Sequence, residues 1–287
     1  GPGDALRYPE LDPLASKGER GRVLIIGGGP YHGAPILAGM AAARMGCDLV
    51  HLAVPKQAAE RAAWPTELIP ETIDDTTHLS LDSLEQIEHR ITRGRGVQAL
   101  VIGPGLGTES ATLDAVRAVL DICVTHQIPV VIDADAISAL PKGKWMVGLR
   151  GVATPHATEK QAWLDEIEPS QILVDLSKAI DWDIFGDMAE QCVILTTGAV
   201  DNLVGFAGRG CELRGGNPRM AVGGTGDLLA GSIGGLIATG MTPWSATRLA
   251  CWMLRRAGDL ADTELGPGML ASDIPPYLAK VLSSVMT

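Results

Sequence analysis

The sequence predicts a three-layer α/β protein in which helices cover both faces of a mostly parallel sheet. Short, fully apolar runs alternate along the chain with longer segments of helical character. Continuous apolar runs are typical of strands that are buried on both faces, and the helical segments are long enough to serve as crossover connections. Aromatic residues make up only 4% of the chain and glycines number 35, which favours close packing of helices on a sheet over a β-sandwich.

The first expected strand is Val23-Leu24-Ile25-Ile26, which ends in three glycines at 27–29 and so indicates a buried strand followed by a turn. Similar apolar runs predict further parallel strands at 49–54, 99–102, 130–132, 152–154 and 192–195. Residues 202–207 and 211–214 flank Gly208-Arg209-Gly210, which predicts a hairpin.

Helices are expected between and after these strands. Thr242-Pro243 has the pattern of a cap followed by proline at the first helical position, and it opens a helix through about Ala261. The other expected helices cover residues 34–45, 81–93, 112–125, 158–166, 171–190, 228–238 and the tail from 271. Segment 56–78 contains two prolines and is expected to be a loop, and residues 1–20 an irregular arm. With no break in composition and no internal repeat, we expect residues 1–287 to form one domain.

Composition excludes several classes of function. The net charge of −11 argues against nucleic acid or an anionic membrane surface as partner. No run of 18 apolar residues is present, so no membrane span is expected. The five cysteines are scattered and form no Cys-x-x-Cys pair, which predicts reduced core cysteines in a cytoplasmic protein.

A glycine-rich turn, residues 215–226, runs directly into the apolar helix expected at 228–238 and contains five glycines. Free amides at the start of a helix, together with its dipole, bind anions. Asp227 lies beside them, where a carboxylate can take the proton of an attacking hydroxyl. This combination predicts phosphoryl transfer to a hydroxyl. The alternative is that Asp227 only caps the helix.

Polar or glycine-rich clusters follow five of the expected parallel strands, at 27–33, 103–107, 133–135, 154–159 and 196–198. The carboxyl ends of parallel strands form one rim, where ligands bind. Asp133 and Asp135 could direct Mg²⁺ through water or be turn residues. His156 and Glu159 could contact a ligand and a metal-bound water, or form a capping box. The sequence lacks a P-loop, a Gly-x-Ser-x-Gly elbow and histidines at zinc-ligand spacing.

The order of these motifs closely resembles that of the ADP/ATP-dependent NAD(P)H-hydrate dehydratases, members of the ribokinase-like superfamily, over about residues 15–262. The motifs that carry the resemblance are Lys17-Gly18-x-x-Gly21-Arg22, Tyr31-x-Gly33-Ala34, Gly103-Pro-Gly-Leu-Gly, Asp133-Ala-Asp-Ala, Thr154-Pro-His-x-x-Glu159 and Asn217-Pro-x-Met-Ala-x-Gly-Gly-Thr-Gly-Asp227. The last motif is specific to the family, and the others are not specific when taken singly.

The resemblance implies a ribokinase-like fold and a lyase that repairs hydrated NADH or NADPH. In such enzymes ADP or ATP, with Mg²⁺, phosphorylates the ring hydroxyl, and phosphate then leaves. Asp227 would be the catalytic base and would also contact the substrate. The anion hole would be formed by Gly224, Thr225 and Gly226. A homo-oligomer, dimeric or tetrameric, is also implied.

The resemblance further implies binding roles at four other places. The hydrated dinucleotide would be contacted by Ala34, Gly105 and His156. Glu159 would help to place Mg²⁺ through water. The nucleotide loop would contain Thr197, Gly198 and Ala199. The given sequence contains no segment like the epimerase domain that often precedes this one, so we expect no interconversion of hydrate epimers.

The nucleotide loop departs from the family pattern, which is usually Leu-Lys-Gly-Ala-Gly-Thr. Here Thr197 replaces the lysine, Val200 replaces a glycine and Asp201 adds an acid. The loss of a positive charge near phosphate is expected to weaken nucleotide binding or to change which nucleotide is used. One alternative is a vitamin-alcohol kinase of the same superfamily, which would use the same Asp227 and anion hole but keep its phosphorylated product. Another is a non-catalytic nucleotide-binding protein that has lost the loop lysine. The choices of ADP or ATP, and of hydrated NADH or NADPH, stay open.

Overall fold

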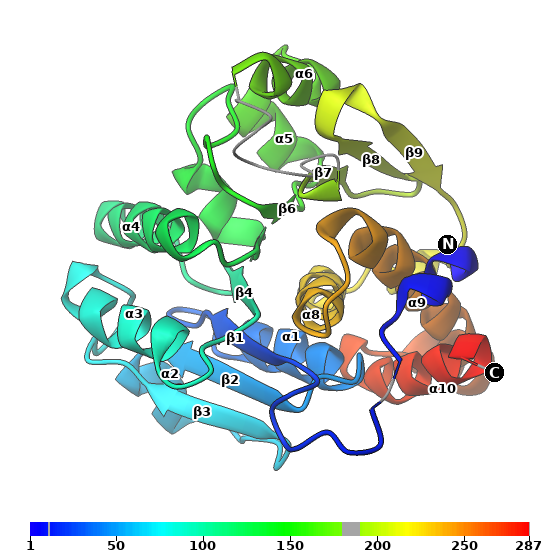
Figure 1. Ribbon diagram of the computed structural model, residues 1–287. Helices are drawn as coiled ribbons and strands as arrows, with labels where there is room; N and C mark the ends of the chain where they lie inside the picture. The colour runs from blue at the N-terminus through cyan, green and yellow to red at the C-terminus, as the bar shows by residue number, and fades with distance from the viewer. Residues whose placement is uncertain (11, 180–189, 287) are drawn as a thin grey trace.

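The centre of the molecule is a nine-stranded sheet with the order β3-β2-β1-β4-β5-β6-β7-β8-β9 (Figure 1). The computed structural model describes residues 1–10, 12–179 and 190–286. Its strands are β1 (Arg22–Ile26), β2 (Leu49–Val54), β3 (Leu68–Thr72), β4 (Ala99–Ile102), β5 (Val130–Ile132), β6 (Gly151–Ala153), β7 (Cys192–Thr196), β8 (Asp201–Gly205) and β9 (Gly210–Leu213). Neighbours from β3 to β7 pair in parallel, while β8 and β9 add an antiparallel hairpin. The predicted mostly parallel sheet and its terminal hairpin are confirmed.

Helices cover the sheet on both faces, which confirms the predicted three layers. One core cluster joins the sheet to α1, α8, α9 and α10, and a second joins its other face to α3, α4, α5 and α6 (Figure 1). The helices are α1 (Gly33–Ala43), α2 (Lys56–Arg61), α3 (Leu84–Thr92), α4 (Ser110–His126), α5 (Ala157–Leu164), α6 (Pro169–Ala179), α8 (Thr225–Ala238), α9 (Pro243–Leu265) and α10 (Pro275–Met286).

Strand β1 shows why the strands of this sheet are continuously apolar. Val23 and Ile25 belong to the core cluster on one face, and Leu24 and Ile26 to the cluster on the other. All four side chains have no exposed surface. Because successive side chains point to opposite faces, a strand covered by helices on both sides needs an apolar residue at every position, each contributing about 1.5–3 kcal/mol on burial.

Glycines let α8 lie against both α1 and the sheet. A Cβ at Gly231 would lie 1.9 Å from the carbonyl oxygen of Ala38, and one at Gly235 would lie 2.8 Å from that of Ala42. A Cβ at Gly234 would lie 2.3 Å from Cγ2 of Val101 in β4. Each glycine costs helix propensity, about 1 kcal/mol, but larger residues would push α8 away from its neighbours.

Two parts of the chain differ from the structure that the sequence predicts, and one predicted helix lies partly outside the described residues. Segment 56–78 was expected to be a loop, yet it contains α2 and β3. Pro70 fits in β3 because β3 is an edge strand, where a missing N–H is tolerated. The N-terminal arm, expected to be irregular, contains a 3₁₀ helix at Pro2–Arg7. Of the helix expected at 171–190, residues 180–189 lie outside the described residues.

The predicted start of the helix at Pro243 agrees with the structure. Helix α9 begins at Pro243, with Thr242 as its cap, and the hydroxyl oxygen of Thr242 accepts a hydrogen bond from the Ser245 amide at 3.4 Å. Within the described ranges, no helix combines the length and the apolar character needed to cross a bilayer.

Candidate functional site

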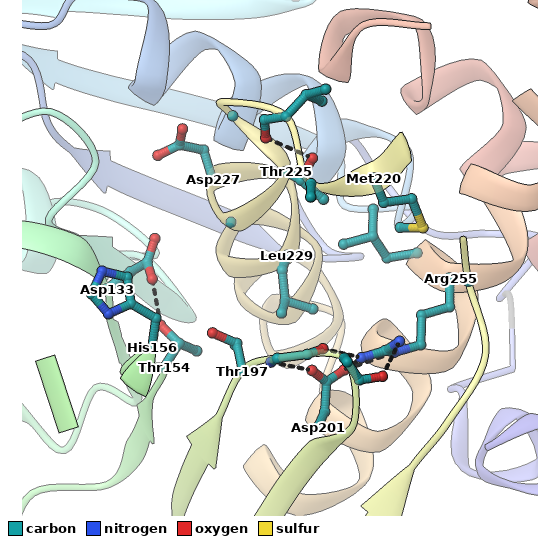
Figure 2. A pocket seen from close by; sticks show the side chains of 18 of the residues that line it. Asp133, Thr154, His156, Thr197, Asp201, Met220, Thr225, Asp227, Leu229 and Arg255 are labelled. Atoms are coloured by element: carbon teal, nitrogen blue, oxygen red, sulfur yellow. Dashed lines mark hydrogen bonds and ion pairs between the residues drawn. The ribbon is translucent and has the colours of Figure 1, made fainter. Parts of the chain in front are cut away.

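A cavity of about 960 Å³ opens at the carboxyl ends of β5, β6 and β7 (Figure 2). The cavity lies where the sequence predicted a binding rim. Its walls come from five places: residues 133–134, the turn at 154–159, the loop at 197–201, the glycine-rich turn with the start of α8, and Leu254 and Arg255 of α9. The predicted site residues that line it are Gly224, Thr225, Gly226, Asp227, Thr197, Gly198, Ala199, His156 and Glu159.

The glycine-rich turn presents the N-terminus of α8 to this cavity. Gly224 is the cap residue, with φ of +100°, and a Cβ there would lie 2.4 Å from Cδ1 of Leu37. Only glycine satisfies both constraints. Among the described residues, the amides of Gly226 and Asp227 have no hydrogen-bond acceptor. Two free amides and the helix dipole form a cradle for an anion.

Asp227, in the first turn of α8, lines the cavity beside this cradle (Figure 2). Burial, and secondly the charge of Asp135, raise the pKa of Asp227 to about 6. A carboxyl with this pKa is mostly ionised at neutral pH and is a stronger base than an ordinary aspartate. Asp227 is therefore placed and tuned to take a proton.

Asp133 and Asp135 take different positions at the end of β5. Asp133 is buried and lines the cavity, and its carboxylate accepts a hydrogen bond of 2.6 Å from the Thr154 hydroxyl. Burial raises the pKa of Asp133 to about 7, although the Thr154 bond opposes this. Asp135 instead accepts a hydrogen bond from the Gly107 amide at 2.8 Å and ties the turns after β4 and β5 together. Asp135 thus acts as a turn residue.

His156 and Glu159 form a capping box at the start of α5, as one of the two sequence interpretations proposed. Nδ1 of His156 accepts from the amides of Thr158 and Glu159 at 3.1 and 3.2 Å, and the Glu159 carboxylate accepts from the His156 amide at 2.9 Å. Because Nδ1 accepts, the neutral ring carries its proton on Nε2. His156 lines the cavity, so this N–H is a donor for a ligand there.

The loop at 197–201 contains no basic side chain, but one reaches it from α9. Asp201 is buried, and its carboxylate accepts from the Gly198 amide at 3.1 Å and from Nε of Arg255 at 2.9 Å (Figure 2). Sequence reasoning missed Arg255. Its partner Asp201 lies 54 residues away, and no local motif marks the pair.

The titratable groups of the cavity wall carry an excess of negative charge. Four acidic side chains line it, those of Asp133, whose pKa is raised to about 7, Glu159, Asp201 and Asp227, against one arginine among the described residues. A phosphate-bearing ligand must therefore be received by backbone amides and by cations that accompany it. Over the described part of the chain, no group of three or more His, Cys, Asp or Glu side chains is placed to hold a metal alone.

Two predicted site residues, Ala34 and Gly105, do not line this cavity. Gly105 has φ of +68°, and a Cβ there would lie 2.2 Å from the Tyr31 carbonyl oxygen. The turns after β1 and β4 therefore pack against each other on the same edge of the sheet. Contact of Ala34 and Gly105 with a dinucleotide stays a prediction.

Solved structures share this architecture. A ribokinase-like superfamily protein of Enterococcus faecalis matches with a TM-score of 0.76 and 22% identity, over 99% of this chain and 95% of that one. The ADP/ATP-dependent NAD(P)H-hydrate dehydratase of Bacillus subtilis, co-crystallised with ATP/Mg²⁺, matches with a TM-score of 0.75 and 23% identity, over 99% and 97%. The predicted ribokinase-like fold is confirmed.

Sequence relatives extend the match. The bifunctional NAD(P)H-hydrate repair enzyme of Hyperthermus butylicus is 35% identical over 99% of this chain, which spans 52% of that protein. The ADP-dependent (S)-NAD(P)H-hydrate dehydratase of Cenarchaeum symbiosum is 32% identical, over 94% of this chain and 90% of its own. The rat ATP-dependent enzyme is 30% identical, over 97% and 83%. The chain thus spans about half the length of its bifunctional relatives. The model of the NAD(P)H-hydrate dehydratase family matches residues 23–280, and the chain belongs to that family.

Proposed function

We propose that this chain dehydrates hydrated NADH or NADPH to the intact cofactor at the expense of ADP or ATP, as a metabolite-repair lyase. The observation that carries the proposal is the position of Asp227, a carboxylate with a pKa raised to about 6 beside the free amides of the α8 N-terminus. The cavity around them, about 960 Å³, has the size of a site for a large ligand. Relatives with 30–35% identity are named for the same reaction.

The proposed chemistry begins with the ring hydroxyl of the substrate. Asp227 takes the hydroxyl proton while the oxygen attacks the terminal phosphorus of the nucleotide, and the bond from that phosphorus to the bridging oxygen breaks to release AMP or ADP. The amides of Gly226 and Asp227 stabilise the charge on the phosphoryl oxygens. The phosphate ester formed is a far better leaving group than hydroxide. Phosphate departs with the C–O bond electrons, the neighbouring ring carbon loses a proton to the departing phosphate or to water, and the electrons of that C–H bond restore the double bond of the cofactor.

The acidic wall of the cavity supports Mg²⁺ as a companion of the nucleotide. Mg²⁺ is commonly held by one or two carboxylates, by water and by substrate phosphates, and not by a cage of protein ligands. Asp133, Glu159 and Asp227 supply carboxylates in this cavity. When bound, Mg²⁺ would neutralise phosphate charge.

The test is recovery of the absorbance of reduced nicotinamide from hydrated NADH, with Mg²⁺ and either ADP or ATP in separate reactions. Recovery with one nucleotide supports the proposal and identifies the donor. A stable phosphorylated product without NADH would instead establish a small-molecule kinase. Nucleotide binding with no product of either kind would establish a non-catalytic binding protein.

Cellular location and assembly also belong to this proposal. We expect a cytoplasmic homo-oligomer. Support for a reducing compartment comes from the five cysteines, which are all free and four of which are buried. Light scattering of the purified protein tests the assembly, and a monomeric mass would contradict it.

A further inference from the structure

One face of α9 contacts two segments that line the cavity, the glycine-rich turn at 215–226 and the loop at 197–201. Positions 255, 258, 259 and 262 have the spacing of neighbours on one helix face. Asp259 accepts a hydrogen bond of 3.0 Å from the Asn217 side chain, and Asp262 pairs with Arg219. Met220 packs against Gly258, where a Cβ would lie 2.4 Å from its sulfur. The glycine-rich turn is thus attached to α9 at three points.

Arg255 joins this turn to the loop at 197–201 (Figure 2). Its Nε donates to the Asp201 carboxylate at 2.9 Å, and Nη2 forms an ion pair with the same carboxylate at 2.8 Å. Nη2 also donates to the Gly198 carbonyl at 2.8 Å, and Nη1 donates to the carbonyls of Ala199 and Gly215. An arginine has five N–H donors, and four of them make hydrogen bonds to Asp201, Gly198, Ala199 and Gly215 here.

This arrangement argues against a direct role for Arg255 as a phosphate ligand. Four of its five N–H groups already donate within the protein, and only 13% of the side chain is exposed. The charge is also neutralised by Asp201, whose side chain is 7% exposed. Arg255 therefore does not supply the positive charge that Thr197 lacks.

Arg255 does fix the direction of the peptide groups in the loop. In a trans peptide the C=O and the N–H point in opposite directions. Since the carbonyls of Gly198 and Ala199 point toward the guanidinium, the amides of Ala199 and Val200 point away from it. In the described part of the chain neither of these two amides has an acceptor. Successive free amides form an anion-binding concavity, and Gly198 and Ala199 line the cavity.

We propose that Arg255, buried against Asp201, is a positioning residue that turns the amides of Ala199 and Val200 toward nucleotide phosphate and aligns this loop with the glycine-rich turn. Oriented backbone amides then take the place of a loop cation. The inference rests on the proposed function, because it assigns the nucleotide to this side of the cavity.

The experiment compares Arg255→Lys and Arg255→Met with the wild type and with Arg256→Met as a matched control. Arg256 is the next residue on α9, is exposed and has no ion pair among the described residues. Calorimetry measures the dissociation constants of Mg·ADP and Mg·ATP. Initial rates give the KM for hydrated NADH, and thermal unfolding reports on the fold.

We expect both Arg255 variants to weaken nucleotide binding at least about tenfold, the factor for losing one hydrogen bond to a charged group, with the KM for hydrated NADH unchanged. Lysine keeps the charge but cannot bridge a carboxylate and three carbonyls, so it should not rescue binding. Arg256→Met should bind as the wild type does.

Two results would overturn the inference. Wild-type nucleotide affinity in Arg255→Lys would show that charge alone suffices. An equal rise in the nucleotide dissociation constant and in the KM for hydrated NADH, together with a lower unfolding temperature, would show a purely structural role. A wild-type protein that binds no adenine nucleotide would contradict the proposed function itself, whereas an active wild type with unaffected variants would contradict only the role of Arg255.

Discussion

Asp227 depends on its neighbours for its chemistry. Its carboxyl lies in the first turn of α8, where the dipole favours the ionised form, yet its pKa is raised to about 6. Burial is the larger cause and the charge of Asp135 the second. A base with this pKa is ionised at neutral pH and still accepts a proton with little penalty.

The raised pKa predicts how activity depends on pH. Because the proposed base, Asp227, acts when ionised, kcat/KM should rise with pH through about 6 and then level off. Asp135→Asn removes a neighbouring negative charge, so the inflection should move to lower pH. The asparagine oxygen can still accept from the Gly107 amide, which preserves the turn. Rate profiles of both proteins test this, and an inflection unchanged or moved to higher pH in the variant would contradict the stated cause.

At the scale of elements, α8 connects the fold to the site. Its glycines allow close contact with α1 and β4, and this contact sets where its N-terminal amides lie. Helix α9 then holds the turn that precedes α8. The two helices thus position the anion cradle.

Gly231→Ala should destabilise the protein by about 1–3 kcal/mol, the usual cost of overpacking. The new Cβ would meet the Ala38 carbonyl at 1.9 Å, so α8 or α1 must shift. Gly33→Ala is the matched control, because Gly33 also lies in a helix but has no atom within 4 Å of a new Cβ. Denaturant unfolding measures both, and equal stability of the two variants would contradict this packing argument.

Elements with local signals could be predicted from the sequence, and those that depend on distant partners could not. The apolar runs of β1, β2, β4 and β7 identify buried strands because both faces are covered. Strand β3 escaped prediction because its residues alternate in burial and include a proline that only an edge strand tolerates.

In the site as well, residues with a local sequence signal could be predicted and residues that depend on distant partners could not. Asp227 and the capping box of His156 with Glu159 follow from spacings within one turn of helix. Arg255 gave no such signal, since its contact with Asp201 forms only once α9 lies beside the loop that contains Asp201.

At the scale of the whole molecule, net negative charge determines how an anionic nucleotide can be bound. The chain carries a net charge of −11, and among the described residues its cavity is lined by four of the carboxyl groups included in that total and by one arginine, which is paired with Asp201. An anionic nucleotide approaches against this field. Binding must therefore rely on amides and on cations that the nucleotide brings.

Removal of divalent cations should consequently abolish detectable nucleotide binding. Calorimetric titration with ATP or ADP, in Mg²⁺ and then in excess chelator, measures the effect. Return of binding when Mg²⁺ is restored is the control for damage to the protein. Equal affinity with and without the cation would contradict the charge argument.

The most direct measurement counts nucleotide consumed and NADH formed in one reaction with hydrated NADH, for the wild type and for Asp227→Asn. The account predicts one NADH for each nucleotide hydrolysed, and a rate about 10²–10⁴-fold lower in the variant with nucleotide binding retained. Asp121→Asn, an exposed aspartate on α4, should match the wild type. NADH formed without nucleotide consumption, or a fully active Asp227→Asn, would contradict the account.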